Sequence, residues 1–520
     1  MKKQYMDRMK KNNIGLDILA LLVGVALVFA FAPFHLPWLA LVSFAALFLI
    51  WSRSTPLRAA WRGFLFGSAF YGVGLHWLFS TLGGVDESFL PILTIAMTGL
   101  VLANICLPGV CGYIHVSLSR QRSPLISVLL FASVWTLGEW VRTWWMTGFP
   151  HYMAGYGFID TPLAGFAPYI GVLGLTFVVL LAGGLLALGL IGPVKKMRLS
   201  AFAALLSLFL SGTVLGHLEW TQPISQPLEV RLIHGNQDGE RKFRRYKVID
   251  TIERYLAMSQ IEPRPDLVLW HESSVAYDLK GVYRFLDAQV DSLREAGTEL
   301  LLGSYIERDG KSYNALFVGA EPKLRYLKRH LIPFGEFTPD IPFLSDMGDM
   351  PNVAMDALTS GPSEQGLLRV KGVPLASSIC FENHFGNELR YDWKDAQLLV
   401  HVSDVSWFEE TWLPEQALQI ARMRALESGK PMLHATNKGI SAIIDPRGGL
   451  VETRSRGEGW FDGSIQPRRG QTPYTVWGEW PLLLLTSTLL LFALAAKIRI
   501  IRYTSLSTPK TSMPVASTVE

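Results

Sequence analysis

Long apolar runs fill most of the first 220 residues, and this pattern constrains the fold more than any other feature of the chain. A helix that crosses a bilayer needs about 20 mostly apolar residues. We therefore expect seven transmembrane helices in this part and an eighth near the carboxyl end, of which the second and the last are short. The runs lie at about 14–32, 37–51, 63–81, 89–116, 125–142, 162–192, 200–217 and 481–496.

The composition of the whole chain agrees with a membrane protein. Charged residues make up 18% of the 520 residues and hydrophobic residues 49%, whereas a soluble domain carries about 25% charged residues. These values exclude a single soluble domain, and they exclude a disordered chain, which needs low hydrophobicity and high net charge. A net charge of +4 without a basic stripe excludes a nucleic-acid-binding protein.

Between the seventh and eighth runs lies a segment of ordinary charge, which is long enough for one large soluble domain. We therefore expect four parts. They are a bundle of seven helices at 1–218, a soluble domain at 219–479, a returning helix at 480–502 and a disordered tail at 503–520.

The distribution of Lys and Arg predicts the orientation, because short loops rich in these residues are retained in the cytoplasm. Alternate loops differ sharply in this respect. The segments 1–13, 52–62, 117–124, 193–199 and the tail from 497 contain 17 Lys and Arg residues, whereas 33–36, 82–88 and 143–161 contain none. We expect both termini in the cytoplasm and the soluble domain on the opposite side of the membrane.

Within the soluble domain, short apolar runs alternate with amphipathic helical patterns. Continuous apolar strands that alternate with helices favour a layered α/β fold with buried sheets. The expected helices lie at 243–261, 282–296 and 415–429. The expected strands lie at 228–235, 266–272, 299–306, 314–320, 373–381, 396–403, 431–437 and 439–445.

Several of these runs are followed by polar residues, at the positions where loops of an α/β fold carry functional groups. Glu272 ends the run DLVLWHE, and Cys380 follows VPLASSI with Glu382 two residues later. Lys328 and Glu336 lie in the segment RYLKRHLIPFGEF. An isolated buried carboxylate is costly, so Glu272 must face a cleft or a partner. Taken singly, the Glu and Lys residues are more often surface groups.

Cys380 is the only cysteine of the soluble domain, because Cys106 and Cys111 lie in the fourth apolar run. Exported domains usually pair their cysteines, so a single one is either a small buried side chain or a reactive thiol. The sequence contains no Cys and His spacing typical of a zinc site and no phosphate-binding loop. We expect neither a metal nor a cofactor.

The order Glu272, Lys328 and Cys380 resembles the triad of the nitrilase superfamily of carbon–nitrogen hydrolases. Joined to eight apolar helices, it resembles the bacterial apolipoprotein N-acyltransferase family. The resemblance implies an αββα sandwich attached to membrane helices. The matching segments are 62–79, 138–163, 235–236, 313–316, 328–337, 380–382, 421–431, 436–448 and 472–479, of which KRHLIPFGEF and ARMRALE are quite specific.

The resemblance implies a role for each residue of the site. Cys380 is the nucleophile, and Lys328 lowers the pKa of its thiol. Lys328 also stabilises an oxyanion together with the backbone N–H of Phe381. Glu272 takes and returns the proton. The supporting residues are Glu336, which holds the lysine or polarises an amine, Glu382, which supports the loop, and Tyr313 and Asn314 of the segment YNAL.

The same resemblance implies a ping-pong reaction between two lipid-anchored substrates. Cys380 takes an acyl chain from a membrane phospholipid and passes it to the α-amino group of a diacylglyceryl-cysteine at the N-terminus of an apolipoprotein. The site must then face the outer leaflet of the bacterial inner membrane, and the protein is expected to work as a monomer.

A further set of residues is expected near the lipid substrates. Glu139 and Arg142 lie one helical turn apart at the outer end of the fifth run, where they either bind head groups or form an ion pair at the helix end. Trp144 and Trp145 are typical of aromatic residues at a membrane interface. Trp407 is expected to contact substrate.

Several segments around the site depart from the family pattern, although the triad is intact. The usual Trp-Pro-Glu is Trp270-His271-Glu272, and the usual Ser-Asn-Asp-Ala-Trp-Phe is Ser-Asp-Val-Ser-Trp-Phe at 403–408. A usual His in the next helix is Ala417. Two other functions therefore stay open: a membrane-anchored amidase that gives its acyl group to water, and a non-catalytic membrane module that kept the fold.

Overall fold

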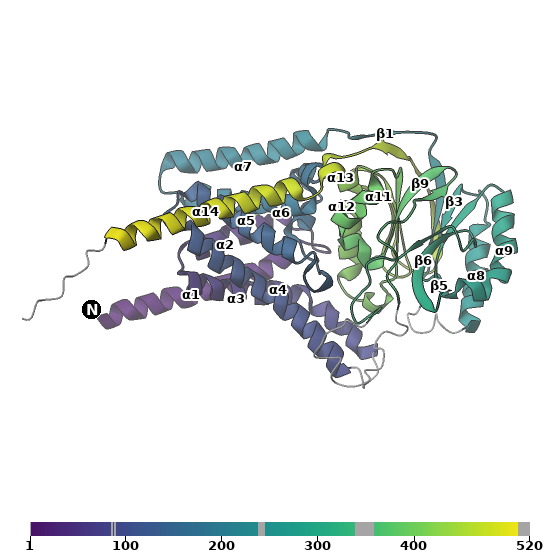
Figure 1. The fold of residues 1–520 in the computed structure, drawn as a ribbon, viewed down its shortest axis with the longest axis horizontal. Coiled ribbons are helices and arrows are strands. Elements are labelled where there is room, and N and C mark those ends of the chain that lie inside the picture. Colours follow the sequence, from purple (N-terminus) through teal and green to yellow (C-terminus); the bar gives the residue numbers. More distant parts are fainter. Residues whose placement is uncertain (1, 85–86, 88–89, 238–244, 338–357, 508–520) are drawn as a thin grey trace, which may run out of the picture.

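A computed structural model describes residues 2–84, 87, 90–237, 245–337 and 358–507 of the chain. Figure 1 shows two parts beside each other, a bundle of long helices and a layered domain of strands and shorter helices. The last helix returns from the domain and lies along the bundle (Figure 1).

Every expected apolar run is helical over most of its length. Prolines at the first turn begin several helices, and the side chains of Thr55 and Ser123 cap two of them by accepting hydrogen bonds from the N–H groups of Arg58 and Ile126. The bundle consists of α1 (Lys2–Val28), α2 (Pro37–Ser52), α3 (Pro56–Gly74), α4 (Leu90–Ser119), α5 (Pro124–Val141), α6 (Ala167–Ile191), α7 (Lys195–Gly216) and α14 (Trp480–Ser507).

In the described part of the chain, five helical segments are long and apolar enough to cross a membrane, fewer than the eight expected. α1 and α2 contain apolar stretches shorter than these. α3 ends at Gly74, and the run expected to continue to residue 81 changes into the 3-10 helix η1 (His76–Gly84). The five segments are Leu90–Ser119, Pro124–Val141, Pro162–Ile191, Lys195–Gly216 and Trp480–Arg499.

The carboxyl end also differs from the expectation. α14 continues to Ser507, past the expected helix end at residue 502. The rest of the expected tail, residues 508–520, lies outside the described residues.

Glycines allow α3 and α4 to approach each other closely. A Cβ added to Gly63 or Gly67 would overlap the backbone carbonyls of Pro108 and Ile105 on α4. Small residues at such positions are a common way for helices to pack within a membrane. α6 is the most deeply buried of the candidate spans, because α2, α5 and α7 surround it.

The layered domain contains two large sheets. The first has the order β14-β2-β3-β5-β6-β7, with β4 beside β5, and the second has the order β13-β12-β11-β10-β9-β8. The central strands of both sheets run parallel. The strands are β2 (Leu228–His234), β3 (Leu267–Leu269), β4 (Val275–Asp278), β5 (Glu299–Arg308), β6 (Lys311–Val318), β7 (Arg325–Leu327), β8 (Leu368–Val370), β9 (Val373–Ile379), β10 (Leu398–Ser403), β11 (Met432–Thr436), β12 (Ser441–Ile444), β13 (Leu450–Arg454) and β14 (Gly459–Ile465). Outside them, β1 (Thr221–Pro223) pairs with β15 (Arg468–Gly470).

Three apolar cores hold these sheets and the helices in four layers. Between the sheets, Leu232 and Leu301 of the first pack with Leu375, Val400 and Leu433 of the second. α8 (Arg245–Ser259) and α9 (Leu279–Glu295) cover the first sheet. α11 (Gly386–Trp393), α12 (Leu413–Ser428) and α13 (Pro473–Trp477) cover the second. The expected αββα sandwich is confirmed.

α12 belongs to both parts of the molecule. Leu418, Ala421 and Ala425 on one face pack against the second sheet. Ile420 and Met423 on the other face belong to the apolar core of the bundle. α12 is therefore buried on two opposite sides, and it joins the domain to the bundle.

The close approach of α3 and α4 gives a prediction for stability. Gly67→Ala adds a methyl group where the backbone of α4 leaves no room, so we expect a loss of about 1–3 kcal/mol. Gly72→Ala on the same helix is the matched control, because its Cβ meets nothing within 4 Å. Thermal unfolding in detergent measures both, and equal melting temperatures would contradict the packing described.

Candidate functional site

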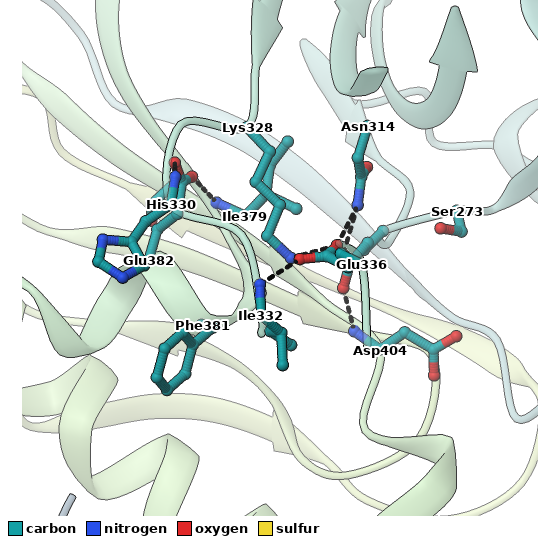
Figure 2. A network of polar contacts seen from close by, with 12 residues as sticks. Ser273, Asn314, Lys328, His330, Ile332, Glu336, Ile379, Phe381, Glu382 and Asp404 are labelled. Atoms are coloured by element: carbon teal, nitrogen blue, oxygen red, sulfur yellow. Dashed lines mark hydrogen bonds and ion pairs between the residues drawn. The ribbon is translucent and has the colours of Figure 1, made fainter. Parts of the chain in front are cut away.

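The residues expected to carry the chemistry converge from the ends of several strands. Glu272 follows β3, Lys328 follows β7 and Cys380 follows β9, so that both sheets contribute. The end of β10 adds Ser403 and Asp404. Figure 2 shows Lys328 and Glu336 pointing toward each other, with Asn314 and Asp404 beside them.

Three hydrogen-bond donors fix the carboxylate of Glu272. Its Oε1 accepts from Asn314 Nδ2 at 2.7 Å and lies 3.5 Å from Lys328 Nζ. Its Oε2 accepts from the backbone N–H of Asp404 at 2.7 Å. Only 6% of the side chain is exposed. Glu272 is therefore held in one orientation inside the protein.

Lys328 lies between two carboxylates. Its Nζ is 2.7 Å from Glu336 Oε1, and its side chain is 1% exposed. The other oxygen of Glu336 accepts from the backbone N–H of Ile332 at 2.9 Å (Figure 2). Burial alone would lower the pKa of Lys328, but Glu336, Glu272 and Cys380 outweigh it and raise that pKa well above its usual value. The lysine stays a cation.

Cys380 begins the 3-10 helix η6 (Cys380–His384), directly after β9. Its φ of 55° lies in the left-handed region, which is unusual for a residue other than glycine and makes a sharp turn between strand and helix. The side chain is partly exposed. The turn therefore presents the thiol at the edge of the sheet.

Burial is the main reason that the Cys380 thiol stays protonated. Burial, together with a smaller effect of Glu272 and against Lys328, raises the pKa of Cys380 to about 12. Lys328 thus acts in the expected direction, but its effect is smaller than the others combined. The thiol is neutral at physiological pH, so a base must accept its proton when the sulfur reacts.

Glu382 joins the Cys380 turn to the loop that carries Lys328. Its Oε1 accepts from the backbone N–H groups of Arg329 and His330, at 2.6 and 3.2 Å. Its Oε2 accepts from the N–H of Ile379 at 2.7 Å (Figure 2). Tyr326 donates to both oxygens. One buried carboxylate therefore sets the position of the thiol relative to the ammonium group.

The structure places the other expected residues at varied distances from this cluster. Asn314 touches Glu272, whereas its neighbour Tyr313 packs on the core between the first sheet and its helices. The ring of Phe381 stacks on Phe149 of the loop between α5 and α6, with 6.4 Å between ring centroids. Trp407 is partly exposed in the short helix η7 (Ser406–Phe408).

Glu139 and Arg142 differ from the expectation. Both are buried, so neither faces the surface where a head group would lie. Glu139 accepts from Trp135, Ala154 and Thr176. Arg142 donates to Tyr71 and to two carbonyls of the loop after α5. Each residue binds its own partners, because the loop folds back over the helix end.

Trp144 and Trp145 are about half exposed, as expected of aromatic residues at an interface. They belong to the same loop, whose Thr147 carbonyl accepts from His330 at 2.9 Å. The loop therefore lies directly against the segment that carries Lys328.

Two groups near the site were absent from the sequence-based expectations. The backbone N–H of Asp404 binds Glu272, and the position of Asp404 after a buried strand could have indicated it. His384, His151 and Gln416 form a hydrogen-bonded series behind Cys380. They come from three distant segments, so no local motif marks them.

The thiol pKa gives a prediction for pH dependence. Alkylation by a neutral reagent follows the thiolate fraction, so its rate at Cys380 should rise about tenfold per pH unit between about pH 7 and 10. Glu272→Gln removes a charge that raises this pKa and should speed alkylation, whereas Lys328→Met should slow it. Iodoacetamide labelling in a Cys106→Ala background, followed by mass spectrometry, measures the rates. A plateau near pH 8.5 would contradict the assigned pKa.

The hydrogen bonds of Glu382 give a second prediction. Glu382→Gln replaces an acceptor with an N–H₂ group that faces backbone donors, so we expect a loss of about 1.5–3 kcal/mol. The control is Glu388→Gln, at an exposed carboxylate, where a change within about 0.5 kcal/mol is expected. Thermal unfolding compares them, and equal stabilities would show that Glu382 does not join the two loops.

Comparison with known proteins accounts for both parts of the chain. The model of the apolipoprotein N-acyltransferase N-terminal domain matches residues 23–185, and that of carbon–nitrogen hydrolases matches 268–474. An apolipoprotein N-acyltransferase of Methylococcus capsulatus is 36% identical over 89% of this chain and 93% of its own. One of Coxiella burnetii is 32% identical over 90% of this chain and 97% of its own. The chain belongs to the apolipoprotein N-acyltransferase family.

Proposed function

We propose that this multi-pass membrane protein moves a fatty acyl chain from a phospholipid, through a thioester on Cys380, to the α-amino group of a diacylglyceryl-cysteine on an apolipoprotein. One observation carries the proposal. The buried cluster of Glu272, Lys328 and Glu336 lies where a proton acceptor and a fixed positive charge would serve the Cys380 thiol.

In the first step, Cys380 Sγ attacks the ester carbonyl of the phospholipid while Glu272 accepts the thiol proton. Transfer during the attack is required because the thiol is neutral at rest. Lys328 and the backbone N–H of Phe381 stabilise the negative oxygen of the tetrahedral intermediate. The C–O bond then breaks, Glu272 returns its proton to the leaving oxygen, and a lysophospholipid departs.

In the second step, the α-amino group of the acceptor attacks the thioester. Glu272 accepts a proton from the amine, and the negative oxygen again forms beside Lys328. The C–S bond breaks, the sulfur regains the proton, and the acceptor leaves with an amide. Glu336 holds Lys328 throughout, and Glu382 and Asn314 support the two loops and Glu272. Neither step requires a metal or a cofactor.

The position of the site relative to the bundle supports lipid-anchored substrates. The residues next to Cys380 contact the loop between α5 and α6, where Phe149 stacks on Phe381. Trp144 and Trp145 extend from the same loop with about half of their surface exposed. We assign these tryptophans and Trp407 to the lipid entrance, while Tyr313 supports the strand behind it. Glu139 and Arg142 stabilise the loop through hydrogen bonds to its backbone.

The membrane arrangement that we propose has eight crossings, at the apolar runs identified in the sequence. The excess of Lys and Arg in alternate loops supports cytoplasmic termini and a catalytic domain, residues 219–479, outside the cytoplasm. α1, α2 and α3 then cross together with the five candidate spans, since they pack into the same core. The protein acts as a monomer.

A labelled phospholipid tests the proposal. The purified protein should form an adduct that hydroxylamine removes, Cys380→Ala should form none, and Cys106→Ala, at the exposed cysteine of α4, should form it normally. A synthetic diacylated lipopeptide should then receive the label.

The outcomes separate this function from the two alternatives. Loss of the adduct to water at the same rate with and without lipopeptide would indicate a hydrolase. Absence of an adduct in the wild-type protein would indicate a non-catalytic module.

A further inference from the structure

A series of close polar contacts connects the Cys380 turn to the bundle. His384 Nδ1 lies 3.2 Å from the carbonyl oxygen of Phe381, and its Nε2 lies 3.0 Å from His151 Nδ1. His151 Nε2 lies 2.7 Å from Gln416 Oε1. His151 belongs to the loop between α5 and α6, and Gln416 to α12. The series thus runs from the residue beside the nucleophile to the membrane part.

The orientation of Gln416 determines the direction of these bonds. Its Nε2 donates to the backbone carbonyl of Ala32 at 3.1 Å, and a carbonyl can only accept. Its Oε1 therefore faces His151, so His151 must carry a proton on Nε2. A neutral imidazole has one proton, which leaves His151 Nδ1 as an acceptor.

His384 consequently has two acceptors and one proton. Its Nε2 faces His151 Nδ1, and its Nδ1 faces the Phe381 carbonyl. Both rings are neutral, because burial lowers the pKa of His151 to about 4 and that of His384 well below its usual value. Nearby Arg142, Arg424 and His330 act in the same direction. Only one of the two contacts of His384 can be a hydrogen bond at a time.

We propose that His384 is a positioning residue for acyl transfer, with two tautomers that hold either the Phe381 peptide or the bundle loop. With the proton on Nδ1, His384 holds the carbonyl of Phe381 and so restrains the backbone at this residue, whose N–H stabilises the oxyanion in the proposed function. With the proton on Nε2, it binds His151 instead and releases Phe381. The inference rests on the proposed function, because it assigns a role in forming the thioester.

Two substitutions imitate the two tautomers. In His384→Asn, the side-chain amide nitrogen occupies the place of Nδ1 and can donate only to Phe381. In His384→Gln, the amide nitrogen occupies the place of Nε2 and can donate only to His151. Both remove the aromatic ring, so they share any loss that comes from ring packing alone.

The experiment measures the rate at which labelled phospholipid acylates Cys380 in a single turnover. We expect the Asn variant to keep a rate near that of the wild type, and the Gln variant to be slower by about tenfold to a hundredfold, as for a misplaced catalytic group. Alkylation of Cys380 by iodoacetamide involves no oxyanion, so its rate should be equal in both variants, as should their melting temperatures.

The results separate this inference from the proposed function. Equal acylation rates in the two variants, or a slower Asn variant, would overturn the role of His384. A parallel loss of acylation, alkylation and melting temperature in the Gln variant would indicate a merely structural role and would also overturn it. If the wild-type protein itself forms no thioester, the proposed function fails first.

Discussion

The site depends on one ammonium group buried between two carboxylates. Burial alone would disfavour the charged form of Lys328, and the two carboxylates of Glu272 and Glu336 outweigh that effect. Each partner is also tied to the backbone, Glu272 through Asp404 and Glu336 through Ile332. The cluster therefore has little freedom to rearrange, and its charges are in place before any substrate arrives. The packing of the two sheets offsets the free-energy cost of burying this charged cluster.

The same cluster explains how the thiol of Cys380 can stay protonated and still lie beside a group that accepts its proton. An exposed thiolate would be open to oxidation. The carboxylate and the low polarity around Cys380 keep the proton on sulfur, and the carboxylate that disfavours the anion is also the group able to take the proton away. In the proposed mechanism, the thiol loses this proton as the sulfur attacks a carbonyl group. Glu382, which spans the Cys380 turn and the Lys328 loop, keeps the two reactive groups aligned.

Much of this arrangement could be predicted from the sequence, because buried strands have a clear signature and functional groups follow them. Glu272 and Cys380 were identified at strand ends, and the layered α/β fold followed from apolar strands that alternate with helices. The burial of Glu139 was not predicted, since the pattern shows where a helix ends but not that the next loop folds back over it. The break in α3 after Gly74 was missed for a related reason: the apolar run continues, while the helix geometry changes. His384 contacts the side chain of His151, and the backbone N–H of Asp404 binds Glu272. Both partners lie far away in the sequence, and such contacts leave no trace in local patterns.

Because α12 is buried on two sides, we expect residues 219–479 to need the bundle in order to fold stably. Separated from the bundle, residues 219–479 would present Ile420, Met423 and Leu426 to water, together with the buried side chains of Gln416 and Glu427. Such a fragment would expose an apolar surface of α12 close to the Cys380 turn. It would also lose the bundle residues that contact this turn. The helix bundle therefore supports the candidate site as well as anchoring the protein in the membrane. We expect the bundle and the domain to fold together.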